Sequence, residues 1–556
     1  MVNVKNLFGM AVMATALVGC SSNDNLAPDG KDNVGKTGEA YASFTINLPT
    51  TSGTRADEPG TPSFAEGEAK EYEVKNGTIL IFTNEGKFVT SAQLGNMNPW
   101  KDIKTDGVTT AATATVKLSG VTVGGNYQAL VLLNNDVDAS TSKVKLPTAG
   151  ESYATWSAKA ENATAAYTKT DYIFMANAPK YTDASAEPTT LVPVANICAS
   201  REQAEAKAAT TVYVERGLAK VTMQKFNADG YAIAAGTYKG DKVEIKAWQL
   251  DVTNKSTFPV HQTSSLTDGF ANIWSTPRFY DGDNKTFKRV YWGVDPNYSD
   301  ATLQNLIACK DAFNMIGKDD IAGKTGNDHP QYCLENTFDL ANMMQGQTTR
   351  VVFKAVFTPK DFTTGQTFYK IGNNTAIWDA TKLAQQIHTV AVTAMGITDA
   401  AEQENYVVKL DASTNNISGT AGLHTITAAN IEYKGTGTSL VAANIDKINE
   451  KLGLKETGIS TYLNGEAYYI ARIKHFNELT PWTAGEGYGT ANDKYLGRYG
   501  VLRNNWYDLS VNSISGLGYP DIPEVKPDVP DDENEQYINV EVKILDWAKR
   551  SQSIDL

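Results

Sequence analysis

The stretch Tyr537-Ile-Asn-Val-Glu-Val-Lys-Ile-Leu-Asp-Trp547, close to the end of the chain, alternates between apolar and polar residues. One face of an extended backbone would carry its apolar residues, which are Ile538, Val540, Val542 and Ile544. The other face would carry its polar residues, which are Asn539, Glu541 and Lys543. This alternation predicts a half-buried β-strand.

The strand is separated from the preceding chain by residues 519–535, which are rich in proline and acidic residues. The prolines cannot donate ladder hydrogen bonds and the acidic side chains repel one another, so we expect an extended, solvated linker. In polyproline geometry it would reach roughly 50 Å. A strand on such a linker is suited to pair with another molecule, although folding back on its own subunit or forming a local hairpin stays open.

The apolar residues after Ile544 change face, because Leu545 and Trp547 have the opposite parity. A bulge at this point, or a second short strand, would explain the change. We expect Trp547 to fill a pocket, the alternative being a partly exposed aromatic ring.

A second strand with the same period is expected over 41–48. Its apolar face would carry Ala42, Phe44, Ile46 and Leu48. A polar loop rich in glycine and proline follows it and contains Arg55, and exposed loops of this kind are where proteolysis concentrates. Cleavage after Arg55 would remove the strand and leave an open sheet edge beside an apolar groove, which can accept another strand. The alternative is a permanent edge strand, with Arg55 an ordinary loop charge.

Length and charge set the broad class of the protein. The chain has 556 residues, which suggests two or three domains, and a net charge of −13, which argues against a nucleic-acid partner. Many short strand-like runs separated by turn residues predict a mainly β protein built from β-sandwiches. These runs are 77–82, 87–89, 127–133, 172–175, 211–223, 243–250, 348–357, 467–473 and 505–511. Helices are expected over 302–313, 376–390 and 441–452, and a domain break within 225–240.

The N-terminus has the pattern of an export signal. Lys5 precedes an apolar run over 7–18 that is too short to span a membrane, and Leu17-Val-Gly-Cys20 closes it. This last motif resembles the bacterial lipobox, in which the cysteine is acylated and becomes the new N-terminus. An ordinary secretory signal with a chance cysteine is the alternative. Of the remaining cysteines, Cys309 and Cys333 are candidates for a disulfide, but burial as small apolar residues is favoured.

The sequence carries no complete catalytic or metal-binding motif, so no enzyme activity, cofactor or metal is expected. The histidines, at 261, 329, 388, 424 and 475, lack zinc-site spacing. Gly317 to Thr325 has one residue too many for a phosphate loop and no apolar strand before it, so it is interpreted as a polar turn. Asp281-Gly-Asp-Asn284 falls short of a calcium loop.

Taken in order, several motifs resemble those of the Bacteroidales fimbrillins, most closely the shaft subunits of the minor fimbrium (type V pilus). The motifs are the lipobox, the early strand followed by Arg55, Thr78-Ile-Leu-Ile-Phe82, Val214-Glu-Arg216, Ala219-Lys-Val221, Trp248, Leu334-Glu-Asn-Thr337, Lys354-Ala-Val-Phe-Thr-Pro359, Val501-Leu-Arg-Asn-Asn-Trp-Tyr507 and the C-terminal strand. Each motif is weak alone, and their order carries the resemblance across nearly the whole chain. The residues after Cys20 are less acidic than is usual for surface-exported lipoproteins of this group.

The resemblance implies two β-sandwich domains (transthyretin-like, Greek-key) and a path of maturation. A signal peptide (1–19) would be removed, Cys20 lipidated, and the precursor carried to the outer membrane. A trypsin-like or Arg-specific protease would then cut between Arg55 and Ala56, releasing residues 20–55. The mature chain would comprise domains 56–230 and 231–518, the linker 519–535 and the donor strand 536–556.

In this scheme the donor strand fills the groove of the next identical subunit head-to-tail, with accessory tip and anchor subunits at the ends of the fibre. The fibre would serve adhesion and biofilm formation. The alternative function is a monomeric surface lipoprotein that binds host protein or glycan through its sandwiches. Exposed aromatic residues such as Trp274, Trp292 and Trp482 would then line the binding site, although core burial is the favoured expectation for them.

Overall fold

A computed structural model describes residues 37–49, 68, 71, 73–95, 101–105, 108–137, 141–159, 161–162, 167, 171–180, 188–263, 290, 292–298, 309–322, 326, 329–339, 342–372, 374–410, 418–420, 423–454, 457–475, 495–527, 529–531 and 538–546. The predicted export signal, Cys20, Arg55, Ala56 and Trp547 lie outside these residues. Within them, no helix is both long and apolar enough to cross a membrane. The chain is mainly β with a few short helices, which confirms the predicted fold class.

The first domain is a sandwich built from one folded sheet, with strand order β3-β2-β6-β8-β10-β1-β5-β4 and β9 paired to β6. The strands are β1 (Thr37–Pro49), β2 (Gly77–Thr83), β3 (Phe88–Gln93), β4 (Lys101–Thr105), β5 (Val108–Thr122), β6 (Tyr127–Leu133), β8 (Met175–Asn177), β9 (Val192–Pro193) and β10 (Thr210–Arg216). The sheet turns at β10, which pairs with β1 through residues 210–213 and with β8 through residues 214–216. The two layers enclose a core to which β1, β2, β5 and β6 all contribute.

The chain passes into the second domain at Gly217, earlier than the break expected within 225–240. One layer is the sheet β17-β11-β26-β27 and the facing layer is β12-β13-β18-β25. Their bounds are β11 (Leu218–Met223), β12 (Tyr231–Ala232), β13 (Lys242–Asp251), β17 (Gln331–Leu334), β18 (Arg350–Thr358), β25 (Glu466–Arg472), β26 (Asn505–Ile514) and β27 (Ile538–Asp546). The expected break is instead a tight turn, in which the N–H of Gly230 donates to the carbonyl of Asn227.

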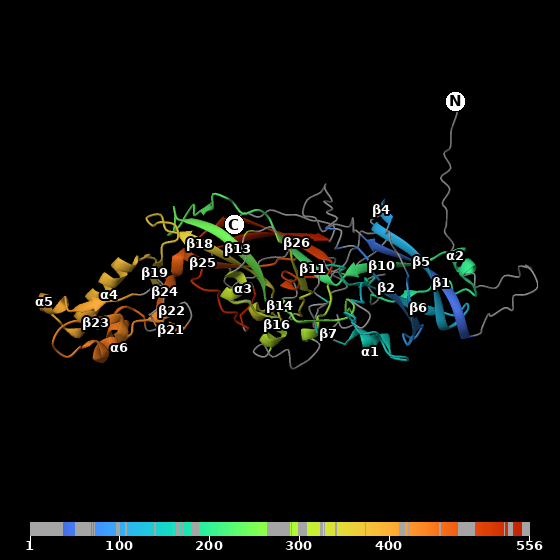
Figure 1. Cartoon of the computed structure of the whole chain (residues 1–556), viewed down its shortest axis with the longest axis horizontal. Helices are drawn as coiled ribbons and strands as arrows, with labels where there is room; N and C mark the ends of the chain where they lie inside the picture. Colours follow the sequence, from blue (N-terminus) through green and yellow to red (C-terminus); the bar gives the residue numbers. More distant parts are fainter. Residues whose placement is uncertain are drawn as a thin grey trace, which may run out of the picture.

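A third unit, here called the lobe, is inserted between β18 and β25 and lies at the end of the molecule away from the first domain (Figure 1). It has its own apolar core. Its elements are β19 (Phe368–Ile371), α4 (Ala380–Met395), α5 (Ala400–Gln403), β20 (Tyr406–Val408), β21 (Ser418–Thr420), β22 (Leu423–Thr425), β23 (Ile431–Tyr433), α6 (Val441–Lys451) and β24 (Ile459–Tyr462). Helix α4 begins at the N-cap Asp379 and ends at Gly396, whose φ of 74° suits a glycine.

Short elements fill the remaining connections. They are α1 (Tyr153–Ser157), β7 (Glu161–Asn162), α2 (Arg201–Glu205), β14 (Thr253–Asn254), β15 (Ser256–Thr257), β16 (Phe313–Asn314) and α3 (Lys318–Ala322). Of the predicted helix 302–313, only residues from 309 are described, and residues 309–312 form a single 3-10 turn. Helix α3 lies within the segment predicted to be a polar turn, so that interpretation was wrong there.

Candidate strand-exchange site

Strand β1 lies inside the first sheet. It runs antiparallel to β5 over its whole length and parallel to β10 through Phe44 to Asn47. The position at a sheet edge, which the alternative interpretation assumed, is therefore wrong. A strand between two partners satisfies backbone groups on both of its sides, so its removal would open two facing edges.

The apolar face of β1 forms the centre of the first core. Ala40, Ala42, Phe44 and Ile46 have no exposed surface and Leu48 is 2% exposed. They pack among side chains of β2, β5, β6 and β10. Burial of a large apolar side chain is worth about 1.5–3 kcal/mol, so Phe44, Ile46 and Leu48 make this strand a major part of the core.

The opposite face of β1 makes polar contacts. Ser43 Oγ donates to the carbonyl of Ala204 in helix α2 at 2.9 Å, and Thr45 Oγ1 lies 2.9 Å from Thr113 Oγ1. Tyr41 exchanges two backbone hydrogen bonds with Cys198, each 2.9 Å long. The period of the sequence thus separates an apolar face from a polar one, and α2 covers the polar face near Ser43.

Strand β27, the predicted C-terminal strand, is paired with its own subunit. It runs antiparallel to β26 from Ile538, opposite Ile514, to Asp546, opposite Asn505. Among the strands that the structure describes it has a single neighbour, β26, and it forms the end of this sheet. The pairing is regular beyond Ile544, and the irregularity lies in β26 between Val511 and Ser513. The bulge predicted after Ile544 is therefore absent from β27 as described, through Asp546.

The linker before β27 is docked along the second domain through its described residues 519–527 and 529–531, here called the strap. Tyr519 forms a two-bond bridge with Tyr468, and Pro530 forms an isolated bridge with Met344. Asp531 is 2% exposed and accepts a hydrogen bond from Thr348 Oγ1 at 3.2 Å. The expectation of a solvated linker was therefore wrong over this range. Proline lacks an N–H donor, but the backbone carbonyl groups of the strap can still accept hydrogen bonds from the body of the domain.

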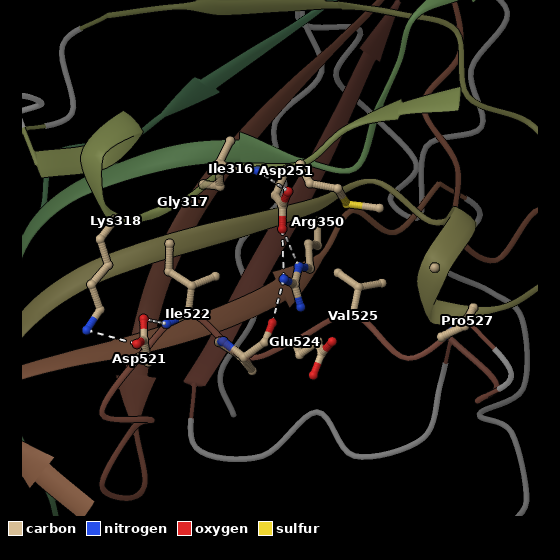
Figure 2. A pocket seen from close by; sticks show the side chains of 13 residues that line it. Asp251, Ile316, Gly317, Lys318, Arg350, Asp521, Ile522, Glu524, Val525 and Pro527 are labelled. Carbon is tan, nitrogen blue, oxygen red and sulfur yellow. Dashed lines mark hydrogen bonds and ion pairs between the residues drawn. The ribbon is translucent and has the colours of Figure 1, made fainter. Parts of the chain in front are cut away.

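A pocket of about 370 Å³ lies between the strap and the body (Figure 2). At its base, Arg350 binds Asp251 at 2.7 Å and donates through Nη2 to the carbonyl of Pro523 at 2.8 Å. At its rim, Lys318 lies 3.1 Å from Asp521. Figure 2 shows that these contacts join the strap to the body on either side of Ile522.

The segment before β2 is fixed to the second domain at Glu71, which has no exposed surface. Its carboxylate lies 2.5 Å from Lys220 Nζ and accepts a 2.5 Å hydrogen bond from the hydroxyl of Tyr332. Arg216 Nε donates to the Glu71 carbonyl at 2.8 Å. Burial lowers the pKa of Arg216 to about 10. These contacts clamp the domain junction from the N-terminal side.

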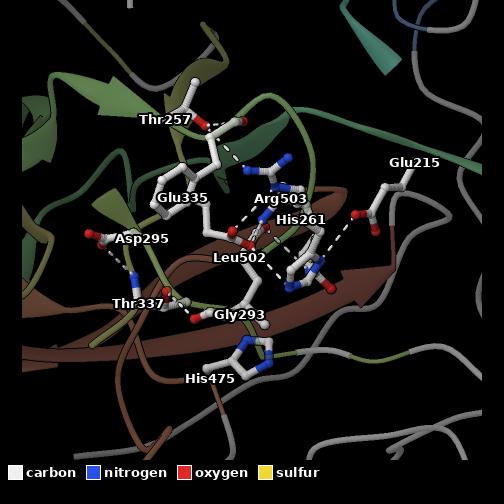
Figure 3. A network of polar contacts seen from close by, with 12 residues as sticks. Glu215, Thr257, His261, Gly293, Asp295, Glu335, Thr337, His475, Leu502 and Arg503 are labelled. Atoms are coloured by element: carbon white, nitrogen blue, oxygen red, sulfur yellow. Dashed lines mark hydrogen bonds and ion pairs between the residues drawn. The ribbon is translucent and has the colours of Figure 1, made fainter. Parts of the chain in front are cut away.

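The fold brings one histidine between two acidic side chains, an arrangement that the spacing of the residues in the sequence did not predict. His261 Nδ1 lies 3.0 Å from Glu215 and Nε2 lies 3.9 Å from Glu335, which also pairs with Arg503 at 3.2 Å (Figure 3). All of these side chains are at most 3% exposed. The network joins Glu215 of the first domain to His261, Glu335 and Arg503 of the second.

The remaining predicted site residues are structural or lie outside the described part. Trp292 is fully buried, whereas residues 274 and 482 are not described. Cys198 and Cys333 are buried free thiols, which confirms the favoured interpretation of Cys333, and burial raises the pKa of Cys333 to about 12. No cluster of metal-ligating side chains occurs among the described residues.

The C-terminal region, which contains β26, the strap and β27, has a recognisable family. Residues 460–553 match the family described as "Major fimbrial subunit protein type IV, Fimbrillin, C-terminal". This region is similar to the C-terminal region of the fimbrillins. The resemblance to fimbrillins drawn from the sequence is confirmed over these residues.

Solved structures of fimbrial proteins also align with the chain. A fimbrilin (fimA) from Porphyromonas gingivalis W83 aligns at 10% identity and a TM-score of 0.35, covering 92% of this chain and 99% of that chain. The tip fimbrial protein Mfa3 of the same species aligns at 10% identity and 0.28, covering 91% and 100%.

A fimbrial assembly protein from Parabacteroides distasonis aligns at 13% identity and a TM-score of 0.26, covering 61% and 93%. The architecture is given by the strand topology, and the similarity to the fimbrillin family lies in residues 460–553. No curated protein matches the chain.

Proposed function

We propose that this fimbrillin-like chain is the shaft subunit of a surface fimbria and polymerises by exchange of its C-terminal strand. Proteolysis after Arg55 releases β1, and the groove between β5 and β10 then accepts β27 of a neighbouring identical subunit. The observation that carries the proposal is the contrast between the two strands. The strand expected to leave occupies an interior position, and the strand expected to replace it occupies an edge.

The pairing of β27 supports a favourable exchange. Within the described part of its own subunit β27 pairs with β26 alone, whereas a strand in the place of β1 would pair with β5 and with β10. Each hydrogen bond contributes a net stabilisation of about 0.5–1.5 kcal/mol. The second ladder of hydrogen bonds would therefore make the exchanged state more stable than the self-paired state. Because the groove and the donor differ, the contact is head-to-tail and extends as a filament.

The clamp at Glu71 supports cleavage at Arg55 as a limited event. Glu71 follows Arg55 in the chain and is bound to Lys220, Tyr332 and Arg216 of the domain junction. Residues from Glu71 onward therefore stay attached when β1 is released. Export as a lipoprotein through Cys20, arrival at the outer membrane, processing by a trypsin-like or Arg-specific protease, and capping by tip and anchor subunits complete the proposed route to an extracellular fimbrium.

The experiment treats the protein starting at Leu26 with trace trypsin and runs it unboiled on a denaturing gel. Two controls accompany it, an Arg55→Gln variant and a version ending at Asp531, which keeps the strap and lacks β27. We expect a ladder of oligomers from the full-length protein alone, with a new N-terminus at Ala56. Monomer in every lane, or a ladder without β27, would overturn the proposal.

A further inference from the structure

The strap is held at both of its ends by backbone hydrogen bonds to the second domain. At one end, the N–H groups of Tyr519 and Tyr468 each donate to the other residue's carbonyl at 2.8 Å. At the other end, Gln345 N–H donates to the Val529 carbonyl at 2.8 Å, and Asp531 N–H donates to the Met343 carbonyl at 3.1 Å. An extended chain anchored at both ends is an added edge segment of the domain rather than a loose linker.

Side chains hold the middle of the strap. Arg350, which is 3% exposed, reaches the carbonyl of Pro523, and Ile522 packs against the buried side chains of Ala247, Val352 and Tyr468 (Figure 2). Gly346 lies under Pro527, and a Cβ atom there would come 2.8 Å from Cα of Pro527. The absence of a side chain at 346 is what allows the strap to lie directly on the body.

The strap and β27 differ in whether the hydrogen bonds that each makes on its own subunit would be replaced after exchange. The hydrogen bonds that β27 gives up on β26 have counterparts in the groove of β1, which is built to hold an extended strand. The bonds of the strap have no such counterpart, because the groove is already filled by the donor strand. Release of the strap would also expose Ile522 and the side chains beneath it to water.

We propose that the strap stays docked on its own subunit within the fibre, so that β27 alone is exchanged and its reach is set by the length of chain between Asp531 and Ile538. This inference rests on the proposed function. Fully extended, the chain from Asp531 to Ile538 spans at most about 25 Å at roughly 3.3–3.6 Å per residue. The partner is a second copy of this chain, whose groove opens within that distance of the end of the strap. Neighbouring subunits therefore meet closely, and the fibre is stiff.

Two matched disulfides test the proposal. A strap staple, Met344→Cys with Pro530→Cys, joins two residues that lie opposite each other in an antiparallel bridge. The hydrogen bonds of this bridge are made by the flanking residues, and the Cα atoms of such a non-hydrogen-bonded pair lie closer together than those of a hydrogen-bonded pair. A tail staple, Ser510→Cys with Glu541→Cys, joins opposed residues of β26 and β27. Each protein is treated with trypsin in its oxidised form and, as its own control, after reduction.

We expect the oxidised strap staple to give the same ladder as its reduced form, and the oxidised tail staple to stay monomeric until reduced. A strap staple that polymerises only after reduction would overturn the inference. Absence of a ladder from the parent protein and from every reduced variant would instead contradict the proposed function, so the two failures are distinguishable.

A second pair of variants needs no disulfide. Deletion of residues 532–535 shortens the span between Asp531 and Ile538 to at most about 11 Å if the strap stays docked, so we expect the ladder to be lost. Replacement of the same residues by Gly-Ser-Gly-Ser keeps the length and removes the charge, and should leave the ladder intact. An undiminished ladder from the deletion variant would show that the strap peels away.

Discussion

Glycine at position 346 sets the distance between the strap and the second domain. Addition of one methyl group in Gly346→Ala brings the new Cβ to 2.8 Å from Cα and 3.2 Å from Cβ of Pro527. Forcing a carbon atom into a packed contact costs typically about 1–3 kcal/mol, so we expect the strap to lift and its bonds to weaken. Faster proteolysis within residues 519–531 and a lower unfolding temperature would measure this effect.

The control for this prediction is Gly38→Ala, where an added Cβ meets nothing within 4 Å. It should leave both measurements unchanged. Equal behaviour of the two variants would mean that the strap is not pressed against residue 346.

Asp295 connects stability to pH. Its carboxylate is 2% exposed and accepts hydrogen bonds from Asn254 Nδ2 and from the backbone N–H groups of Asn297 and Thr337. Burial nevertheless raises the pKa of Asp295 to about 8 from its ordinary value of 3.8. Between these values the folded state keeps a proton that the unfolded state has lost, so this group's contribution to the free energy of unfolding decreases as the pH rises from about 4 to 8.

The variant Asp295→Asn cannot titrate and should remove that dependence. We expect the destabilisation caused by the substitution to be greater at pH 5 than at pH 8, because the wild-type side chain is itself costly to bury at the higher pH. Urea unfolding at the two pH values measures the difference. A destabilisation that is the same at both pH values would show that Asp295 does not change protonation over this range.

Strand β1 illustrates, at the scale of the element, how the two faces of one strand differ in energy. Phe44 is fully buried in the first core, whereas Thr45, on the opposite face, makes an exposed hydrogen bond to Thr113. Truncation of a buried phenylalanine costs about 3–5 kcal/mol, so Phe44→Ala should strongly destabilise the first domain of the uncleaved precursor. Thr45→Ala should cost under about 1 kcal/mol, since it removes one exposed hydrogen bond.

Thermal unfolding before and after trypsin distinguishes this effect from a general loss of folding. Cleavage after Arg55 would remove the substituted residue, so the cleaved, polymerised forms of both variants should unfold like the parent. A Phe44→Ala defect that persists after cleavage would show that β1 is retained in the mature chain.

Apolar periodicity predicted the strands that have a regular apolar face. It did not predict strands with little contrast between apolar and polar residues. The predicted runs 41–48, 77–82 and 243–250 correspond to β1, β2 and β13, because each alternates or is buried on both faces. The long strand β5 was not predicted, since its threonine and alanine residues carry little apolar contrast. Residues 172–174 are not strand, and Tyr172 has a φ of 57°.

Tertiary contacts account for the rest of what the sequence did not predict. The composition of residues 519–531 is that of a solvated linker, yet backbone carbonyls, Arg350 and Gly346 dock it on the body. The His261 network joins side chains from four separate segments of the chain, and no spacing rule relates them. Cleavage and strand exchange were suggested by the alternation of two distant strands, and only the topology places one inside a sheet and the other at an edge.

At the scale of the whole molecule, the lobe is a separate unit carried by one hairpin. Strands β19 and β24 pair from Phe368 opposite Tyr462 to Ile371 opposite Ile459, and the Gly372 N–H donates to the Gly458 carbonyl at 2.8 Å. Phe368 and Tyr462 stack 4.6 Å apart within the core of the second domain. The lobe has a core of its own and lies at the opposite end of the molecule from β1 and β5 (Figure 1).

Replacement of residues 373–457 by Asn-Gly should therefore close the β19–β24 hairpin, because this dipeptide suits a two-residue turn. Tyr369 packs in the core of the lobe and would become exposed to solvent, so we expect some loss of stability. The sheets that hold β1 and β27 are untouched, and the variant should form the same trypsin-dependent ladder as the parent. A folded variant that stays monomeric would show that the lobe contacts the neighbouring subunit, and polymerisation would then need a surface beyond the groove and its donor strand.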